Sequence, residues 1–438
     1  MKDTRSMERL VGGLLLASAA VVPLVFSIAL DDVFSTPKLS TMWVVFAVVV
    51  AVLAWNTVRG RRPAFEWVTA IDVWVLALVA LSVVSFIFSV DRVQSLWGER
   101  LQHQGLVTLL LYAGFFFVAR AVLAGPARLV LLTRAIGVGA SIVAAYAVVQ
   151  WLGLDPIWTE LPQGRVFSTI GQSNALGAYL AMTLPLAIVT AVGAESRKAR
   201  VAWIVATMLQ VVALALTISR GAYLALAISV VVLLVAMRRD LRWPGRRAIV
   251  LTGVIVSATL IVVAFLAPTR DTVEEIARRL VASTDIDVPG SVRMHLDLWN
   301  VAGEIIIDHP LIGTGPDTYA VVFPEYRDDV LPADQAALLA PFRVESPHNV
   351  YLAIATGSGL AALIAYLVMI GLSYRVIGRR MRTAGREHRL VLTGVIAAVT
   401  GHLIADLFIT AEVTGTWVFW MLLGSAIGTV TSGRVRQA

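Results

Sequence analysis

The sequence of 438 residues contains no cysteine. This excludes disulfide scaffolds, thiolate metal sites and cysteine nucleophiles. Charged residues are also scarce, at 15% of the chain compared with about 25% in ordinary soluble domains, and the mean hydropathy is +0.80. The nucleotide-binding pattern GxxxxGK[ST] and the catalytic patterns HExxH and GxSxG are missing too. The low charged fraction and the high mean hydropathy together exclude a soluble globular protein.

The sequence is dominated by long apolar runs. A membrane-spanning helix needs about 20 apolar residues. Runs of this length predict twelve spanning helices, at residues 10–30, 39–58, 68–90, 105–124, 128–152, 175–194, 200–218, 221–237, 248–267, 348–373, 390–409 and 414–431. The first run follows basic residues, but it is too long for a signal peptide and is expected to remain as the first span. We therefore expect an all-α polytopic membrane protein.

The basic residues predict the orientation of these spans. The net charge is +7, and most of the 36 Lys and Arg residues fall in the segments on one side of the predicted spans. The short segments on the other side hold only Lys38, Arg92, Arg100, Arg165 and Arg220. Because basic loops stay in the cytoplasm, both termini are expected inside. The positive charge is thus mainly a topology signal, which anionic lipid headgroups can reinforce, and it needs no nucleic-acid partner.

One long polar segment interrupts the spans. We expect three parts: residues 1–267 with nine spans, an external loop at 268–347, and residues 348–438 with three spans and a cytoplasmic tail. Within the loop, Asp271–Leu280 and Ser291–Ile307 are typical of helices, with Leu296, Trp299, Ile305 and Ile306 as apolar positions of the second. The loop is too short for a large core, so it is expected to lie against the membrane surface as a cap.

Three residues near the predicted outer face are candidates for chemistry. Arg220 lies in TISRGAY between two spans, where a guanidinium can hold an anionic group; the alternative is a snorkelling arginine at a helix end. His348 directly follows the loop and can take a proton from a hydroxyl; the alternative is an interfacial histidine bonded to water or backbone. Arg293, in the loop, is a second anion-binding candidate or a solvated helix charge.

Other polar pairs have competing interpretations. Asp285 and Asp287 have the DxD spacing of a divalent-metal site, but two acids in a polar loop occur often by chance, and no metal is expected. His402 and Asp406 would share one helix face and could form the proton relay of a transporter, or a satisfied buried pair. The glycines of the segment IGTGP do not lie between a strand and a helix, so they predict a turn and no nucleotide loop.

Seven segments, taken in order, resemble the O-antigen ligase and polymerase superfamily of membrane glycosyltransferases. These are DDVFSTPK (31–38), LWGERLQHQGL (96–106), RVFSTIGQSNALGAYLAM (165–182), TISRGAY (217–223), the R-x5-W-x2-A run from Arg293 to Ala302, HPLIGTG (309–315) and HNVYLAIATGSGLAALIAYL (348–367). Each segment is a weak signal alone. Their order, and the histidine that follows the long loop, make chance agreement improbable.

The resemblance implies a GT-C-like fold and transfer of a glycan from an undecaprenyl-diphosphate carrier to an acceptor hydroxyl, with inversion and without a metal or other cofactor. It implies catalytic roles for Arg220, Arg293 and His348. Substrate-binding residues are expected within the shared segments and next to them: Lys38, Arg165, Asn174, Tyr319 and Asn349. The implied location is the bacterial inner membrane, with the active site facing outside.

Several alternatives stay open on the sequence alone. Within the superfamily, the chain could be a ligase acting on lipid A core or another surface lipid, a polysaccharide polymerase, or a protein O-oligosaccharyltransferase. The expected partners are the lipid-linked glycan donor, a lipid or glycolipid acceptor and membrane lipids. A secondary transporter using His402 and Asp406 is the alternative of another class, but transporters place such charges near mid-membrane between repeated halves.

Overall fold

The computed structural model describes residues 2–60, 69–238 and 292–435. The described residues form α-helices and short 3₁₀ turns and contain no strand. Ten of the helices are long and apolar enough to cross a membrane. They are α1 (Lys2–Val21, continued by the turn η1, Val22–Leu24), α2 (Ser35–Val58), α3 (Ala70–Ile87), α6 (Pro126–Trp151), α7 (Ser173–Gly193), α8 (Arg197–Leu216), α9 (Arg220–Met237), α15 (Val350–Thr383), α16 (Arg386–Ala405) and α17 (Val413–Val435). A shorter apolar helix, α5 (Leu106–Val122), accompanies them.

The prediction of an all-α polytopic membrane protein is confirmed. Eleven of the twelve predicted spans coincide with these helices, and the span predicted at 248–267 lies outside the described residues. The ends of two predicted spans were wrong by more than five residues. The first span ends early, because the helix gives way at Pro23 to a short 3₁₀ turn. The helix α15 continues ten residues beyond the predicted end at 373.

Two helices, α7 and α17, form the centre of the bundle and are almost completely enclosed by the others. Glycine permits the closest approach between α17 and α5. A Cβ at Gly424 would lie 2.3 Å from the carbonyl oxygen of Phe116, and one at Gly428 would lie 2.2 Å from that of Arg120. Small residues at such contacts let helix backbones pack together in a membrane, where no hydrophobic effect drives helices against each other.

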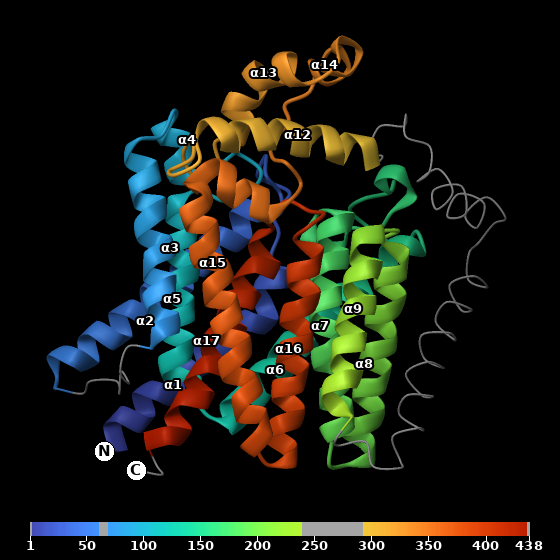
Figure 1. The fold of residues 1–438 in the computed structure, drawn as a ribbon. Helices are drawn as coiled ribbons and strands as arrows, with labels where there is room; N and C mark the ends of the chain where they lie inside the picture. The colour runs from blue at the N-terminus through green and yellow to red at the C-terminus, as the bar shows by residue number, and fades with distance from the viewer. Residues whose placement is uncertain (1, 61–68, 239–291, 436–438) are drawn as a thin grey trace.

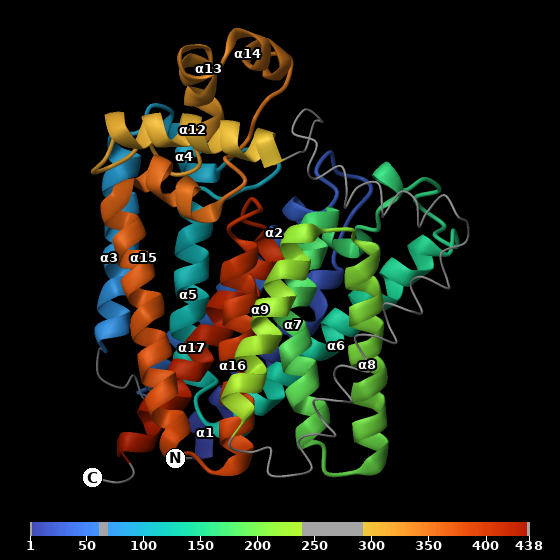
Figure 2. The ribbon, with the colours of Figure 1, turned by 45° about the vertical axis from the view of Figure 1, so that its right-hand side comes forward.

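Three further helices gather at one end of the bundle: α12 (Val292–Asp308), α13 (Tyr319–Val330) and α14 (Ala333–Leu339). We call these three helices the cap, and the end of the bundle beneath them the cap end. Figure 1 shows α12 lying across the spans, with α13 and α14 beyond it and both termini at the opposite end. Figure 2 shows the same crossing from another side. A short helix, α4 (Arg92–Trp97), lies at the cap end as well.

The amphipathic helix α12 buries Leu298, Val301 and Ile305 against α13. These positions, spaced by three and four residues, lie on one face of a helix. Of the four apolar positions named from the sequence, Ile305 is buried here, whereas Leu296 is 48% exposed. The predicted helix at 271–280 lies outside the described residues.

The segment that follows α12 crosses a break in α15. Gly359 has φ 85° and interrupts the helix, which frees backbone groups on both sides of it. The amide of Gly315 donates to the carbonyl of Gly357 at 2.9 Å, and the amide of Leu360 donates to that of Pro310 at 2.8 Å. The glycines of the IGTGP segment therefore form the predicted turn, and this turn joins the cap to α15.

Candidate functional site

His348 lies at the cap end, immediately before α15. Its φ of 48° is uncommon for a residue with a side chain. The next residue, Asn349, caps α15 because its Oδ1 accepts hydrogen bonds from the amides of Tyr351 and Leu352, at 3.0 and 3.1 Å. Trp299 of α12 donates from Nε1 to the carbonyl of Pro347 at 3.1 Å. The backbone around His348 is thus held from both the cap and the bundle.

The imidazole of His348 contacts groups from two other parts of the chain. Its Nδ1 lies 3.0 Å from Oγ1 of Thr410, and its backbone amide donates to Oγ of Ser346 at 3.2 Å. The ring of His295, on α12, lies with its centre 5.8 Å from the ring centre of His348. Burial, with a smaller contribution from His295, lowers the pKa of His348 to about 4. His348 is therefore neutral near pH 7 and able to accept a proton.

Arg220 is the first residue of α9 and is exposed, next to the tight turn that joins α8 to α9. The residue after it, Gly221, packs against residues 406–412, which we call the α16–α17 connection. A Cβ at Gly221 would lie 2.9 Å from Cβ of Phe408, and Thr410, two residues further along this connection, bonds to His348. One short segment thus contacts both the arginine motif and the histidine motif.

Arg165 and Asn174 lie against the same arginine motif. Arg165 donates from Nε to the carbonyl of Thr217 at 2.7 Å and from Nη2 to Oδ1 of Asn174 at 2.5 Å. Thr217 opens the TISRG segment, so these two predicted binding residues are brought together at the segment that carries Arg220. Because the guanidinium is a fixed planar fork, this arrangement orients the amide of Asn174 relative to the α8–α9 turn.

The other predicted binding residues make contacts within the protein. Lys38 is fully buried and donates from Nζ to the carbonyls of Phe34 and Thr169, at 3.1 and 2.7 Å. Tyr319 is buried inside the cap, where its hydroxyl donates to the carbonyl of Leu298 at 2.9 Å. Asn349 serves as the helix cap described above. Substrate contact at these three positions stays a prediction.

Arg293 lies near the start of α12, two residues before His295, and its side chain is partly buried. Residues two positions apart in a helix point to different sides. The ring of His295 lies against that of His348. Arg293 therefore points to another side of α12, one turn before Asp297. Burial raises the pKa of Asp297, and Arg293 opposes this effect. Sequence reasoning missed His295, although the order His295, Trp299 at helical spacing could have suggested one shared face.

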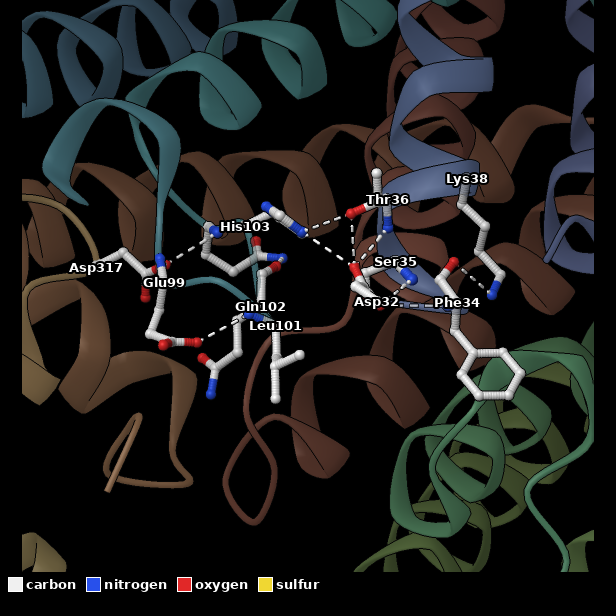
Figure 3. A network of polar contacts seen from close by, with 11 residues as sticks. Asp32, Phe34, Ser35, Thr36, Lys38, Glu99, Leu101, Gln102, His103 and Asp317 are labelled. Atoms are coloured by element: carbon white, nitrogen blue, oxygen red, sulfur yellow. Dashed lines mark hydrogen bonds and ion pairs between the residues drawn. The ribbon is translucent and has the colours of Figure 1, made fainter. Parts of the chain in front are cut away.

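A network of polar residues that the sequence analysis did not select joins two of the shared segments to Asp317, which lies two residues after a third (Figure 3). The carboxylate of Asp317 accepts hydrogen bonds from the amides of Glu99 and Gln104, at 2.7 and 3.0 Å. Beside it, Nε2 of His103 lies 3.1 Å from Oδ2 of Asp32. The network thus fastens the segments 31–38 and 96–106 to the turn that follows the cap helix α12.

The pKa values of the two acids in this network, Asp317 and Asp32, are shifted in opposite directions. Burial raises the pKa of Asp317 to about 7, against the effect of its two backbone hydrogen bonds. Burial also acts to raise the pKa of Asp32, but hydrogen bonds from His103, Ser35 and Thr36 outweigh it and hold that pKa well below its usual range. Asp32 lies in a segment that was recognised from the sequence and Asp317 lies two residues after another, but the individual contacts depend on the fold.

His402 and Asp406, the residues of the transporter alternative, are both buried, and Nε2 of His402 lies 3.4 Å from Oδ2 of Asp406. The backbone carbonyl of Asp406 accepts a hydrogen bond from the amide of Val350 at 2.8 Å. The pair therefore lies near the first turn of α15, at the cap end and away from the middle of the spans.

Asp285 and Asp287 lie outside the described residues. Within the described ranges, no three His, Asp or Glu side chains come close enough together to hold a metal ion. Catalysis without a metal stays a prediction.

The fold defines a polytopic helical membrane protein with a helical cap over one end of its bundle. Residues 204–367 match the model of the family described as O-antigen ligase, a family of glycosyltransferase-like membrane enzymes. This confirms the resemblance to the O-antigen ligase and polymerase superfamily. The matched range includes Arg220, Arg293 and His348. No curated protein matches the chain.

Proposed function

We propose that this protein is a glycosyltransferase that moves a glycan from undecaprenyl diphosphate to an acceptor hydroxyl, with inversion at the sugar C1 and without a metal. The observation that supports this most is the contact of the α16–α17 connection with both functional motifs. Phe408 packs against the glycine next to Arg220, and Thr410 bonds to His348. A diphosphate and a hydroxyl could therefore be held at neighbouring positions at the cap end.

The proposed chemistry divides between these groups. As the bond from C1 to the carrier breaks, negative charge grows on the diphosphate, and Arg220, with Arg293, would stabilise it. His348, kept neutral by its buried surroundings, would take the proton of the acceptor hydroxyl as that oxygen attacks C1 from the opposite side. Arg165 and Asn174 would support the donor side through their contact with the α8–α9 turn.

The proposal includes an orientation in the membrane. The positive-inside rule favours both termini in the cytoplasm and the cap outside, in a bacterial inner membrane. We retain the three expected parts, 1–267, 268–347 and 348–438, on the same argument. The acceptor is a surface lipid or glycolipid in this proposal. A growing polysaccharide or a protein acceptor would give a polymerase or a protein glycosyltransferase with the same chemistry.

The test measures donor binding and single-turnover transfer on the same purified preparations, with a labelled undecaprenyl-diphosphate glycan. His348→Ala should reduce transfer by about 10²- to 10⁴-fold with donor binding largely intact, because a general base acts mainly in the transition state. Arg220→Ala should weaken donor binding as well. Arg220→Lys should restore only part of it, because an ammonium lacks the guanidinium fork. Arg293→Ala should have a milder effect that depends on donor length.

Two variants serve as matched controls. His388, near the start of α16, lies at the end of the bundle opposite the cap, so His388→Ala should transfer at close to the wild-type rate. Arg100, at the cap end, has an exposed ion pair with Asp31, so Arg100→Ala should bind donor normally. Near wild-type transfer by His348→Ala would refute the proposed base. Full activity in all three site variants would favour the transporter alternative.

A further inference from the structure

The hydrogen bonds of His348 form a short chain of hydroxyls. Oγ1 of Thr410 lies 3.0 Å from Nδ1 of His348 and also contacts Oγ of Ser346. The same Ser346 oxygen accepts a hydrogen bond from the backbone amide of His348. Thr410 therefore lies between the imidazole and Ser346, and it comes from a segment more than sixty residues away in the sequence.

The segment that carries Thr410 is itself held at both ends. At one end, the carbonyl of Asp406 accepts a hydrogen bond from the amide of Val350, in the first turn of α15. At the other end, the carboxylate of Glu412 caps α17 by accepting hydrogen bonds from the amides of Thr414 and Gly415, both at 2.8 Å. The hydroxyl of Thr410 is thus presented to His348 from a firmly anchored connection.

A neutral imidazole carries its proton on one of two nitrogens, and the hydrogen bond made by one nitrogen decides the state of the other. If Nδ1 carries the proton, it donates to Oγ1 of Thr410, and the Thr410 hydroxyl in turn donates to Oγ of Ser346. This direction is compatible with the bond from the His348 amide to Ser346, because a hydroxyl oxygen has two lone pairs. Nε2 is then left as a proton acceptor.

We infer that Thr410 is a positioning residue that holds His348 with its proton on Nδ1 and directs Nε2 towards the acceptor hydroxyl. This inference rests on the proposed function. In the step itself, the acceptor oxygen forms a bond to C1, its proton moves to Nε2, and the bond from C1 to the diphosphate breaks with the electron pair leaving on the phosphate oxygen. The imidazolium keeps its Nδ1 bond to Thr410 and afterwards loses the Nε2 proton to water.

The partner of His348 is a neutral hydroxyl, whereas many catalytic histidines have a carboxylate partner. A hydroxyl can set the tautomer but does little to stabilise the imidazolium. Among the described residues, His295 on α12 is the titratable neighbour that affects the pKa of His348, and it acts in the same direction as burial. A carboxylate in place of Thr410 should therefore raise the pKa of His348.

The test compares Thr410→Val, Thr410→Ser and Thr410→Asp in single-turnover transfer across pH 4 to 8. The valine variant keeps the size of the side chain but loses the hydroxyl, so transfer should fall about 10- to 100-fold, less than the roughly 10⁴-fold loss when a triad carboxylate is replaced. The serine variant should restore most of the rate. The aspartate variant should move the acidic limb of the pH profile to higher pH, which a merely structural residue would not do.

A measurement independent of activity reads the tautomer directly. In protein labelled with ¹⁵N-histidine, the His348 signal, assigned by its loss in His348→Ala, should show the proton on Nδ1 in the wild type and in Thr410→Ser, and a mixture of tautomers in Thr410→Val. A proton on Nε2 in the wild type would overturn the inference, as would a wild-type rate and pH profile in Thr410→Val. Activity in His348→Ala would instead refute the proposed function, whatever the Thr410 variants do.

Discussion

Asp317 makes the stability of the cap end depend on pH in a direction unusual for an acid. Burial raises its pKa from 3.8 to about 7, so the folded protein binds this proton more tightly than the unfolded chain does. As pH rises from about 4 to about 7, the unfolded state ionises freely while the folded state does not. The stabilisation from this residue is therefore lost over that window, and it does not return at higher pH.

The size of the effect follows from the pKa and from the surroundings. A rise from 3.8 to about 7 would be worth about 4 kcal/mol for a side chain with no solvent contact. Asp317 keeps partial contact with solvent, and part of the window lies below pH 5. We therefore expect the wild type to lose about 1 to 3 kcal/mol of local stability between pH 5 and pH 8 through this residue.

Asp317→Asn separates this contribution from all other titrations. Asparagine tolerates the φ of 56° found here, and its amide oxygen can accept the hydrogen bonds from Glu99 and Gln104, but it does not titrate. The variant should approach or exceed wild-type stability as pH rises from 5 to 8. As a control, Asp328→Asn changes an exposed acid of the cap paired with Arg327 and should show no such trend.

Hydrogen exchange of residues 94–105, in lipid nanodiscs, is the suitable assay because it reports local opening without requiring reversible unfolding of the whole protein. The protection of the Glu99 and Gln104 amides would be compared in wild type and Asp317→Asn at each pH. If the difference between the two proteins stays constant from pH 5 to pH 8, or if the wild type gains protection relative to the variant, the electrostatic reasoning is refuted.

Three further predictions concern orientation, metal and the break in α15. Single cysteines introduced at Asp328 and Arg379 of the cysteine-free chain should be labelled from outside and from the cytoplasm respectively, and labelling of both from one side would contradict the topology. Transfer by the purified protein should persist in excess chelator, and a loss restored by Mg²⁺ or Mn²⁺ would instead support a metal site at Asp285 and Asp287. Gly359→Ala should lower the midpoint of thermal unfolding strongly, because the added Cβ would lie 2.1 Å from the carbonyl oxygen of Leu311 and φ at this position is 85°. An unchanged midpoint would show that α15 can close its break.

The spanning helices could be predicted because a helix in a membrane satisfies its own backbone hydrogen bonds. The apolar run is then sufficient evidence, whatever surrounds it. The prediction was less accurate where a helix ends for a local reason, as at Pro23, or where it continues into a polar environment, as α15 does towards Thr383. Hydropathy describes how strongly a segment prefers an apolar environment. It does not show where the last hydrogen-bonded turn of a helix lies.

The candidate site was predictable only as a set of segments. Arg220 and His348 stood out because a charged or titratable residue beside an apolar run is costly unless it has a task. Their partners did not stand out. Thr410 is an ordinary threonine in a short connection, and His295 resembles any polar residue of an amphipathic helix; both matter because the fold places them against His348.

The sequence by itself determined that this chain is a helical membrane protein, which of its apolar runs are long enough to cross a bilayer, and which of its segments resemble those of the O-antigen ligases. These properties depend on local composition and on the order of short motifs. Only the tertiary structure decided that Lys38, Tyr319 and Asn349 are engaged within the protein, and that the α16–α17 connection contacts both the arginine and the histidine motifs. Contacts between distant segments depend on the packing of every helix between them, and no local pattern carries that information.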